Sequence, residues 1–154
     1  MDVEIGLTET DRAQSADALK RLLGETYALY VKTHGYHWNV TGPRFQALHA
    51  DFMAQYTELW TALDELAERI RALGIFAPGS SAEMLEPATI VPDNGVPDAE
   101  VMIANLVRGH EAVARAARDG IAAASEVGDD VTVDLMTQRA TIADKTAWML
   151  RASL

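Results

Sequence analysis

The chain has 154 residues, a formal net charge of −10 and no cysteine. This length suits one domain, residues 1–154, with one hydrophobic core, and the absence of thiols excludes a disulfide framework and a thiolate metal site. The negative charge disfavours non-specific binding to phosphate backbones.

Neither a signal peptide nor a membrane span is expected. Residues 1–6 lack the basic start and the apolar stretch of a signal peptide. No apolar run approaches the ~18 residues that cross a bilayer. We therefore expect a cytoplasmic protein with no membrane partner.

Helical periodicity organises the first half of the chain. A capping-box pattern at residues 8–11 predicts the start of a first long helix that reaches about residue 38. Gly24 and Gly35 lie inside it, each at a cost of ~1 kcal/mol relative to alanine, so we expect close packing at both. The second helix is predicted over residues 43–74, from Pro43 at a first helical position to Gly74 as a stop.

The second half begins with a long connection, residues 76–96, that is rich in proline, glycine and serine. A short helix is predicted within it at 81–86. A connection of this length crosses the bundle, so the second and third long helices would run in the same direction. The third is predicted from 97–98 to about 126 and the fourth from 129–130 to the C-terminus. The prediction is an all-α, ferritin-like four-helix bundle with a long crossover between its second and third long helices.

Two stripes of side chains run down the second helix at helical spacing. The first is an expected core face: Phe45, Leu48, Phe52, Leu59, Leu63, Leu66 and Ile70. The second lies about a third of the circumference away and carries metal-ligating residue types: His49, Met53, Tyr56, Trp60, Asp64 and Glu68. Imidazoles and carboxylates suit iron, zinc or manganese.

The candidate ligands of the second stripe are too far apart to share a metal within one chain. Asp64 and Glu68 are four residues apart and share a face, but His49 lies 15 residues before Asp64. At 1.5 Å per residue this is roughly 22 Å. His37, just before the turn, can fold back near His49. One end of the helix thus carries imidazoles and the other carries carboxylates.

A two-fold dimer solves this problem. If two copies pack antiparallel along the second stripe, His37 and His49 of one copy face Asp64 and Glu68 of the other, and a symmetric interface makes two identical sites. The partly apolar filling of Met53, Tyr56 and Trp60 suits such an interface.

Structural interpretations stand beside this one. A lone His49 would more often be an interface histidine, and Asp64 and Glu68 could form a solvated face paired with Arg69 or Arg71. His110 and Glu111 match no ligand motif. Glu-x-x-His pairs, which hold iron inside ferritin-like subunits, are absent from the sequence, which argues against a site within each subunit.

Three runs carry a family resemblance: Tyr36-His37-Trp38-Asn39-Val40-x-Gly42-Pro43-x-Phe45-x-x-Leu48-His49, Asp64-x-x-x-Glu68-Arg69 and Lys145-Thr146-Ala147-Trp148-Met149-Leu150-Arg151. They resemble the Dps family, the starvation-induced DNA-protection proteins of the ferritin superfamily. The resemblance implies a hollow dodecamer, assembled from two-fold dimers, that oxidises Fe²⁺ with hydrogen peroxide or, less readily, dioxygen, and stores the ferric mineral. This is a ferroxidase activity that protects against oxidative stress.

Carried over by position, the resemblance implies that His37 and His49 bind iron from one subunit. Asp64 and Glu68 would bind it from the other, with zinc as a conceivable substitute. It also implies that Trp38 lies beside the iron and takes up oxidising equivalents.

One position departs from the family pattern. The family usually has a carboxylate one turn after the second histidine, where this chain has Met53, a weak thioether ligand for iron. We expect weaker or single-metal binding and slower oxidation. His34, three residues before His37, is a further imidazole of undecided role. A cage with decayed oxidation chemistry is therefore an alternative function.

The termini and the start of the fourth helix leave two further questions. The first eleven residues contain four acidic and no basic residues, so strong DNA binding and a DNA-compacting role are not expected. Asp129, Asp130 and Asp134 are expected to stabilise a helix N-terminus. In the family, acidic residues of this region can line pores that admit Fe²⁺, which is the alternative interpretation.

Overall fold

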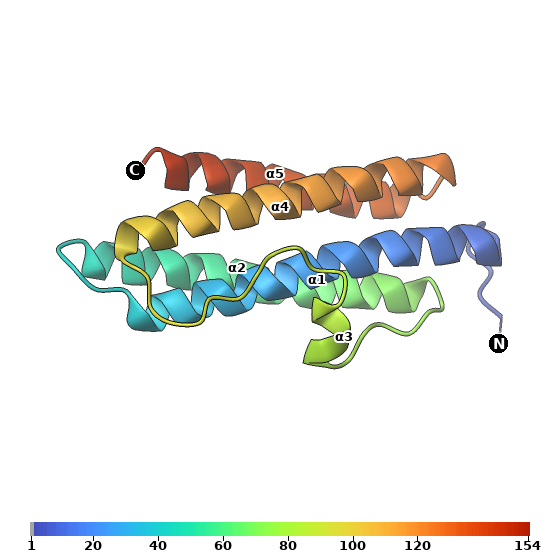
Figure 1. Ribbon diagram of the computed structural model, residues 1–154. Helices are drawn as coiled ribbons and strands as arrows, with labels where there is room; N and C mark the ends of the chain where they lie inside the picture. The colour runs from blue at the N-terminus through green and yellow to red at the C-terminus, as the bar shows by residue number, and fades with distance from the viewer. Residues whose placement is uncertain (1) are drawn as a thin grey trace.

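The computed structural model describes residues 2–154, and these residues form helices and connections without a strand. The elements are α1 (Glu9–Asn39), α2 (Phe45–Ala72), α3 (Ser81–Leu85), α4 (Ala99–Glu126) and α5 (Asp130–Arg151). The four long helices form an elongated bundle, with the short α3 on its side (Figure 1). The predicted all-α, ferritin-like architecture is confirmed, and every predicted helix is present.

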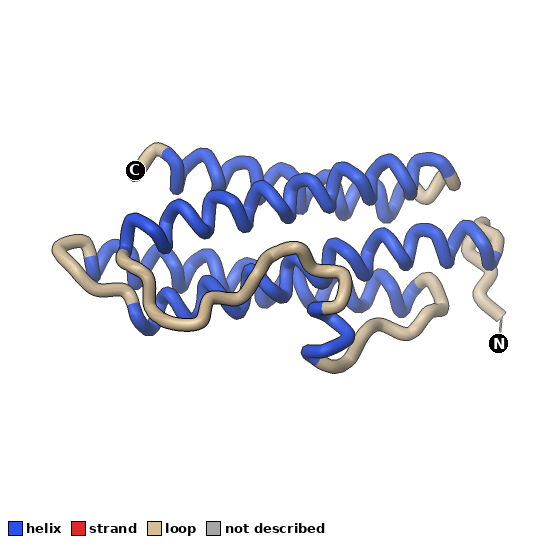
Figure 2. Tube along the Cα trace, viewed as in Figure 1, coloured by secondary structure: helices blue, strands red, loops and turns tan. Residues whose placement is uncertain are grey.

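The long connection runs along the bundle, as predicted. After α2, the chain passes through α3 and returns across α1 before α4 begins (Figure 2). This crossover makes α2 and α4 run in the same direction, while α1 and α2 are antiparallel neighbours, as are α4 and α5 (Figure 1). The long crossover distinguishes this bundle from one with only short hairpin connections.

Local hydrogen bonds explain where the helices begin and end. Thr8 and Asp11 form the predicted capping box of α1. The helix α2 begins at Phe45 rather than at the predicted Pro43, because Gly42, at φ +111°, starts a turn in which the Phe45 N–H donates to the Gly42 carbonyl at 3.0 Å. Gly74, at φ +83°, follows α2 as the predicted stop.

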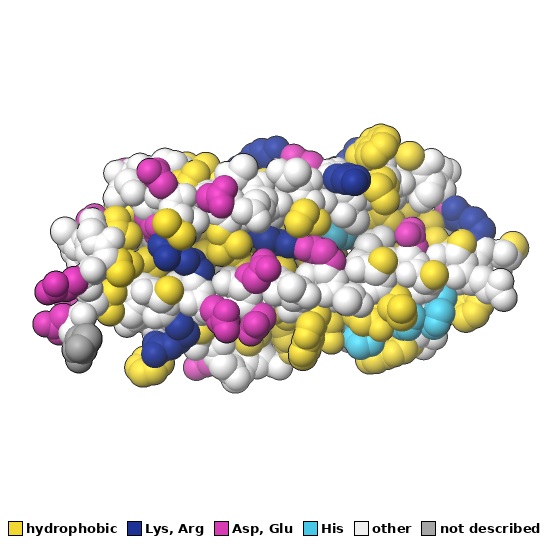
Figure 3. All heavy atoms as spheres, turned by 180° about the vertical axis from the view of Figure 1, so that it is seen from behind, with side chains coloured by type: hydrophobic (Ala, Val, Ile, Leu, Met, Phe, Trp, Pro, Cys, Tyr) yellow, Lys and Arg dark blue, Asp and Glu magenta, His cyan; other side chains and the backbone are white. Residues whose placement is uncertain are grey.

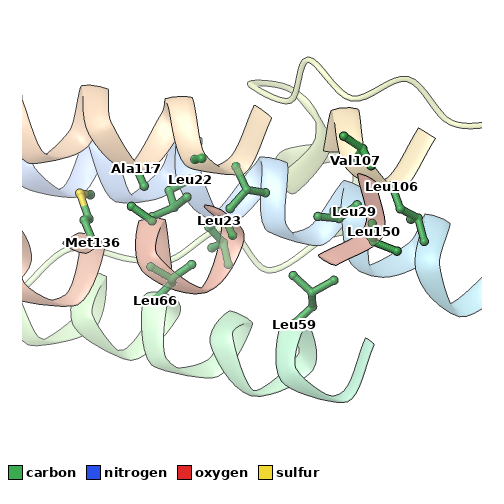
Figure 4. Close-up of a cluster of buried hydrophobic side chains, with 14 of the residues drawn as sticks. Leu22, Leu23, Leu29, Leu59, Leu66, Leu106, Val107, Ala117, Met136 and Leu150 are labelled. Carbon is green, nitrogen blue, oxygen red and sulfur yellow. The ribbon is translucent and has the colours of Figure 1, made fainter. Parts of the chain in front are cut away.

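A continuous apolar core fills the bundle. Figure 4 shows side chains from α1, α2, α4 and α5 meeting there, among them Leu22, Leu59, Leu106 and Met136. Most of the core stripe predicted on α2 is buried. Phe45 is an error of the prediction: its side chain is 42% exposed and lies beside His49, with ring centroids 5.1 Å apart. It sits on the first residue of α2, where the helix has only begun to pack against the bundle.

The two glycines inside α1 differ from each other. A Cβ atom on Gly24 would lie 2.5 Å from the backbone carbonyl oxygen of Met84 and 2.9 Å from Pro87, so the crossover approaches α1 closely at this point. The prediction of close packing is confirmed at Gly24. The same prediction is wrong for Gly35, where a Cβ atom would meet nothing within 4 Å. No helix in the described part of the chain is long and apolar enough to cross a membrane.

Candidate metal centre

Two histidines clasp the junction between α1 and α2. The Nδ1 atom of His37, on the last turn of α1, lies 2.7 Å from the His49 carbonyl oxygen. The Nδ1 atom of His49, on α2, lies 2.8 Å from the His37 carbonyl oxygen. The two rings stack with centroids 3.8 Å apart and an interplanar angle of 17°. The predicted proximity of the two imidazoles is confirmed.

This pairing fixes the chemistry of both rings. A carbonyl oxygen can only accept a hydrogen bond, so Nδ1 must carry the proton in each imidazole. In the neutral ring, the lone pair then belongs to Nε2, on the other side of the ring, where a metal ion can bind it. A backbone carbonyl that orients a histidine in this way is a common support for a metal ligand. The clasp therefore leaves two Nε2 atoms that could bind a metal ion at the junction between α1 and α2.

His34 belongs to an aromatic cluster beside the clasp. Its ring stacks on Tyr56 at 3.9 Å and lies 4.2 Å from the Trp38 ring, while its Nδ1 atom is 3.1 Å from the Tyr30 hydroxyl. Its centroid is 6.1 Å from that of His37. Burial, together with the neighbouring His37, lowers the pKa of His34. Trp38 is 65% exposed and contacts His34.

Asp64 and Glu68 lie exposed on α2, away from the histidines. The alternative in which they pair with neighbouring arginines receives no support. Arg69 donates to Asp129 at 2.7 Å and to Thr132 at 2.9 Å. Arg71 lies over the Phe76 ring at 4.4 Å and donates to a backbone carbonyl. Among residues 2–154, neither carboxylate has a salt-bridge partner.

Within one subunit, the candidate site is half built. No group of three or more histidine, aspartate or glutamate side chains in the described residues converges on one point that could hold a metal ion. Figure 3 shows histidines and apolar side chains gathered near one end of a face, with acidic side chains farther along it. The stripe between them exposes large apolar side chains: Trp60 is 62% and Met53 50% exposed.

The other singled-out residues have structural environments. His110 is buried inside the bundle, with Nε2 3.3 Å from the Gln55 amide oxygen. Burial and the nearby Arg139 charge lower the pKa of His110 to about 4. Glu111 pairs with Arg151 at the surface. These observations agree with the structural interpretation of both residues.

Asp129 is committed to the start of α5 rather than free to line a pore. It is 2% exposed and accepts hydrogen bonds from the backbone of Thr132 at 3.1 Å and from Arg69 at 2.7 Å. Burial alone would raise the pKa of Asp129, but the hydrogen bonds from Thr132 and the Arg69 charge lower it. Asp130 and Asp134 are exposed.

The sequence interpretation missed the reciprocal clasp, since nothing in residue types reveals a side-chain bond to a backbone carbonyl twelve residues away. It also missed Tyr30, whose ring lies 5.7 Å from that of Trp60 and 6.4 Å from that of Tyr56. A signal for Tyr30 was available, because it precedes His34 by one helical turn and therefore shares its face.

Comparisons with known proteins agree with this architecture. The Ferritin family, a ferritin-like domain, matches residues 16–154. A low temperature-induced protein of Nostoc sp. is 39% identical over 97% of this chain and 85% of its own length. DNA protection during starvation protein 2 of Bacillus anthracis is 35% identical, covering 92% of this chain and 97% of that protein.

Solved structures give the same answer. The Dps protein of Vibrio cholerae, described as a member of a broad superfamily of ferritin-like diiron-carboxylate proteins, superposes with a TM-score of 0.93 and 36% identity, over 99% of this chain and 96% of that one. Taken with the bundle, its crossover and the histidine clasp, these matches show that the chain belongs to the Dps family of ferritin-like proteins.

Proposed function

We propose that this protein oxidises iron(II), consumes peroxide as it does so, and stores the ferric product inside a hollow dodecamer built from two-fold dimers. The observation that carries the proposal is the arrangement along α2: two imidazoles held together by the clasp at one end, and two exposed carboxylates at the other. Membership of a family whose relatives are named for protection during starvation supports a role against oxidative stress.

The positions along α2 agree with one two-fold axis. The midpoint between His49 and Glu68 falls between residues 58 and 59, and so does the midpoint between Met53 and Asp64. Antiparallel packing about that midpoint therefore places His49 opposite Glu68 and Met53 opposite Asp64 at the same time. The exposed Trp60 lies next to the axis, where it would be covered by the second copy.

In such a dimer each iron site takes nitrogen ligands from His37 and His49 and oxygen ligands from Asp64 and Glu68 of the second subunit. This mixed set suits ferrous iron, and the carboxylates favour the higher charge of ferric iron. Two ferrous ions together supply the two electrons that, with two protons, reduce one hydrogen peroxide molecule to two water molecules. Dioxygen is the weaker alternative oxidant. Trp38, exposed beside His34, would supply the second electron to peroxide when only one ferrous ion is bound at the centre.

A second function is a storage cage with weakened oxidation, since Met53 occupies the place of a carboxylate and is half exposed in the stripe. Zinc would bind the same two nitrogens and two oxygens but cannot be oxidised. The first eleven residues carry no lysine or arginine, so this stretch offers no charge pairs to DNA phosphates, which disfavours a DNA-compacting role.

The test is peroxide-driven oxidation of Fe²⁺, followed by the absorbance of the ferric product. We expect the native protein to oxidise iron and to keep the product in solution. We expect His49→Ala and Asp64→Ala each to lose most of the rate, and the matched control Asp51→Ala to retain it, because Asp51 lies off the stripe. If iron is oxidised no faster with the native protein than in buffer alone, the ferroxidase proposal is rejected in favour of a storage cage with weakened oxidation.

A further inference from the structure

Three basic side chains line a groove between the crossover and α4, away from the candidate metal centre. Lys32 reaches it from α1, and Arg108 and Arg115 from α4, while residues 89–93 of the crossover form the other wall, around a volume of about 410 Å³. Asp93 is the single acidic lining residue among them. The groove thus has a positive excess on a chain whose net charge is −10.

Two carboxylates on the crossover side of the groove, Asp93 and Glu25, are already engaged. Asp93 accepts a hydrogen bond from the buried Tyr36 hydroxyl and lies 3.4 Å from Lys32. The Asn105 amide donates to the same hydroxyl at 2.8 Å, which holds this network in place. Glu25, behind the crossover, accepts from the Thr89 backbone at 2.8 Å and from the backbone of Ile90 at 3.2 Å. None of these carboxylates is available to neutralise the two arginines.

Arg108 and Arg115 differ from other arginines of α4 and α5. Arg118, Arg139 and Arg151 each pair with a carboxylate. Within residues 2–154, Arg108 and Arg115 form no salt bridge, and Arg108 donates only to the side chain of Asn105, one turn earlier. Both guanidinium groups therefore keep most of their donors for a ligand.

The shape of the groove restricts that ligand. Arg108 and Arg115 are seven residues apart, so their Cα atoms are separated by roughly 10 Å along the helix. Gly109 and Ala112, which lie between them on the same side, leave this stretch of α4 without a bulky side chain. A single phosphate group would be close to one arginine at a time, whereas a chain of two or three phosphate groups can reach both arginines and Lys32.

We propose that this groove binds an elongated phosphate oxyanion, either free oligophosphate or the phosphate chain of a nucleotide. Guanidinium groups bind phosphate oxygens by paired, charge-assisted hydrogen bonds, and Lys32, although paired with Asp93, keeps further N–H donors for a phosphate oxygen. The proposal rests on the groove alone and is independent of the iron chemistry.

Isothermal titration of the assembled protein with tripolyphosphate at low salt tests the site. The variant is Arg108→Gln with Arg115→Gln, and the control is Arg118→Gln, which removes one arginine of the same helix outside the groove. We expect the double variant to bind at least about tenfold more weakly, the control to bind like the native protein, and added salt to weaken native binding.

Adenosine triphosphate and a short DNA duplex complete the experiment. Equal affinity for the nucleotide and for tripolyphosphate identifies the phosphate chain as the whole ligand; tighter nucleotide binding shows that the nucleoside also contacts the groove. The proposal is overturned if native protein binds no tripolyphosphate, if the double variant binds it as well as the control does, or if the arginines bind duplex DNA alone.

Discussion

In the proposed two-subunit centre, Met53 is the residue expected to limit the rate of iron oxidation. It lies one turn after His49 on the exposed stripe and, in the antiparallel register, opposite Asp64. A carboxylate here would join two imidazoles and two carboxylates as an additional oxygen ligand, and hard oxygen ligands bind iron more strongly than a thioether.

We therefore expect Met53→Glu to bind additional iron at each centre and to oxidise it several-fold faster, as measured by ferrous titration and peroxide-driven oxidation. Met53→Gln is the control, since it has a similar size without the charge. Equal iron stoichiometry and rate in both variants would show that this position does not contribute to the centre.

His110 makes stability depend on pH. The pKa of His110 is lowered from 6.5 to about 4, chiefly by burial, so below pH 6.5 the unfolded chain binds a proton that the folded chain does not. Stability is unaffected by this group above pH 6.5 and falls as the pH is lowered toward 4. We expect a loss of about 2 kcal/mol from pH 7 to pH 5.

Denaturant unfolding of the native protein and of His110→Gln at both pH values tests this. The glutamine can still hydrogen-bond to Gln55 but cannot be protonated. Between pH 7 and pH 5 the variant should therefore lose about 2 kcal/mol less stability than the native protein. Parallel pH dependence of the two proteins would mean that His110 is protonated in the folded state as easily as in the unfolded one.

At the level of elements, alanine substitution of the two glycines inside α1 is expected to change stability in opposite directions. Gly24→Ala would place a methyl group against the rigid backbone of the crossover, so it should destabilise the protein by ~1–3 kcal/mol. Gly35→Ala meets open space and should stabilise α1 by ~0.5–1 kcal/mol. Thermal unfolding of the two variants measures both; a stabilising Gly24→Ala would show that the crossover yields at this point.

The same elements show what a sequence can and cannot reveal. Helical periodicity, caps and one long proline-rich connection predicted the bundle, because these signals are local. Gly24 is packed against Met84, a residue 60 positions later in the chain. Such a contact leaves no local signal, so Gly24 and Gly35 looked alike in the sequence.

The candidate centre also shows this limit. Residue type and spacing predicted His37, His49, Asp64 and Glu68 as ligands, and within one subunit the structure confirms only that the two histidines meet. The clasp that fixes the tautomer of both imidazoles was not, because it depends on backbone carbonyls at a helix junction.

For the whole molecule, we propose that each iron centre takes its imidazoles from one subunit and its carboxylates from another. Subunit mixing tests this directly. His49→Ala and Asp64→Ala each damage every centre when assembled alone. In a mixed dimer, however, one centre carries both changes and the other carries neither.

The decisive measurement is therefore the iron oxidation rate after the two inactive variants are unfolded together and reassembled. Random pairing makes half of the dimers mixed, each with one intact centre out of two, so the account predicts about a quarter of the native rate. When each variant is reassembled separately and the two are then mixed without exchange, the rate should stay at the low level of the single variants. A mixture as inactive as its components would contradict the account, because it would place all the ligands of a centre in one subunit.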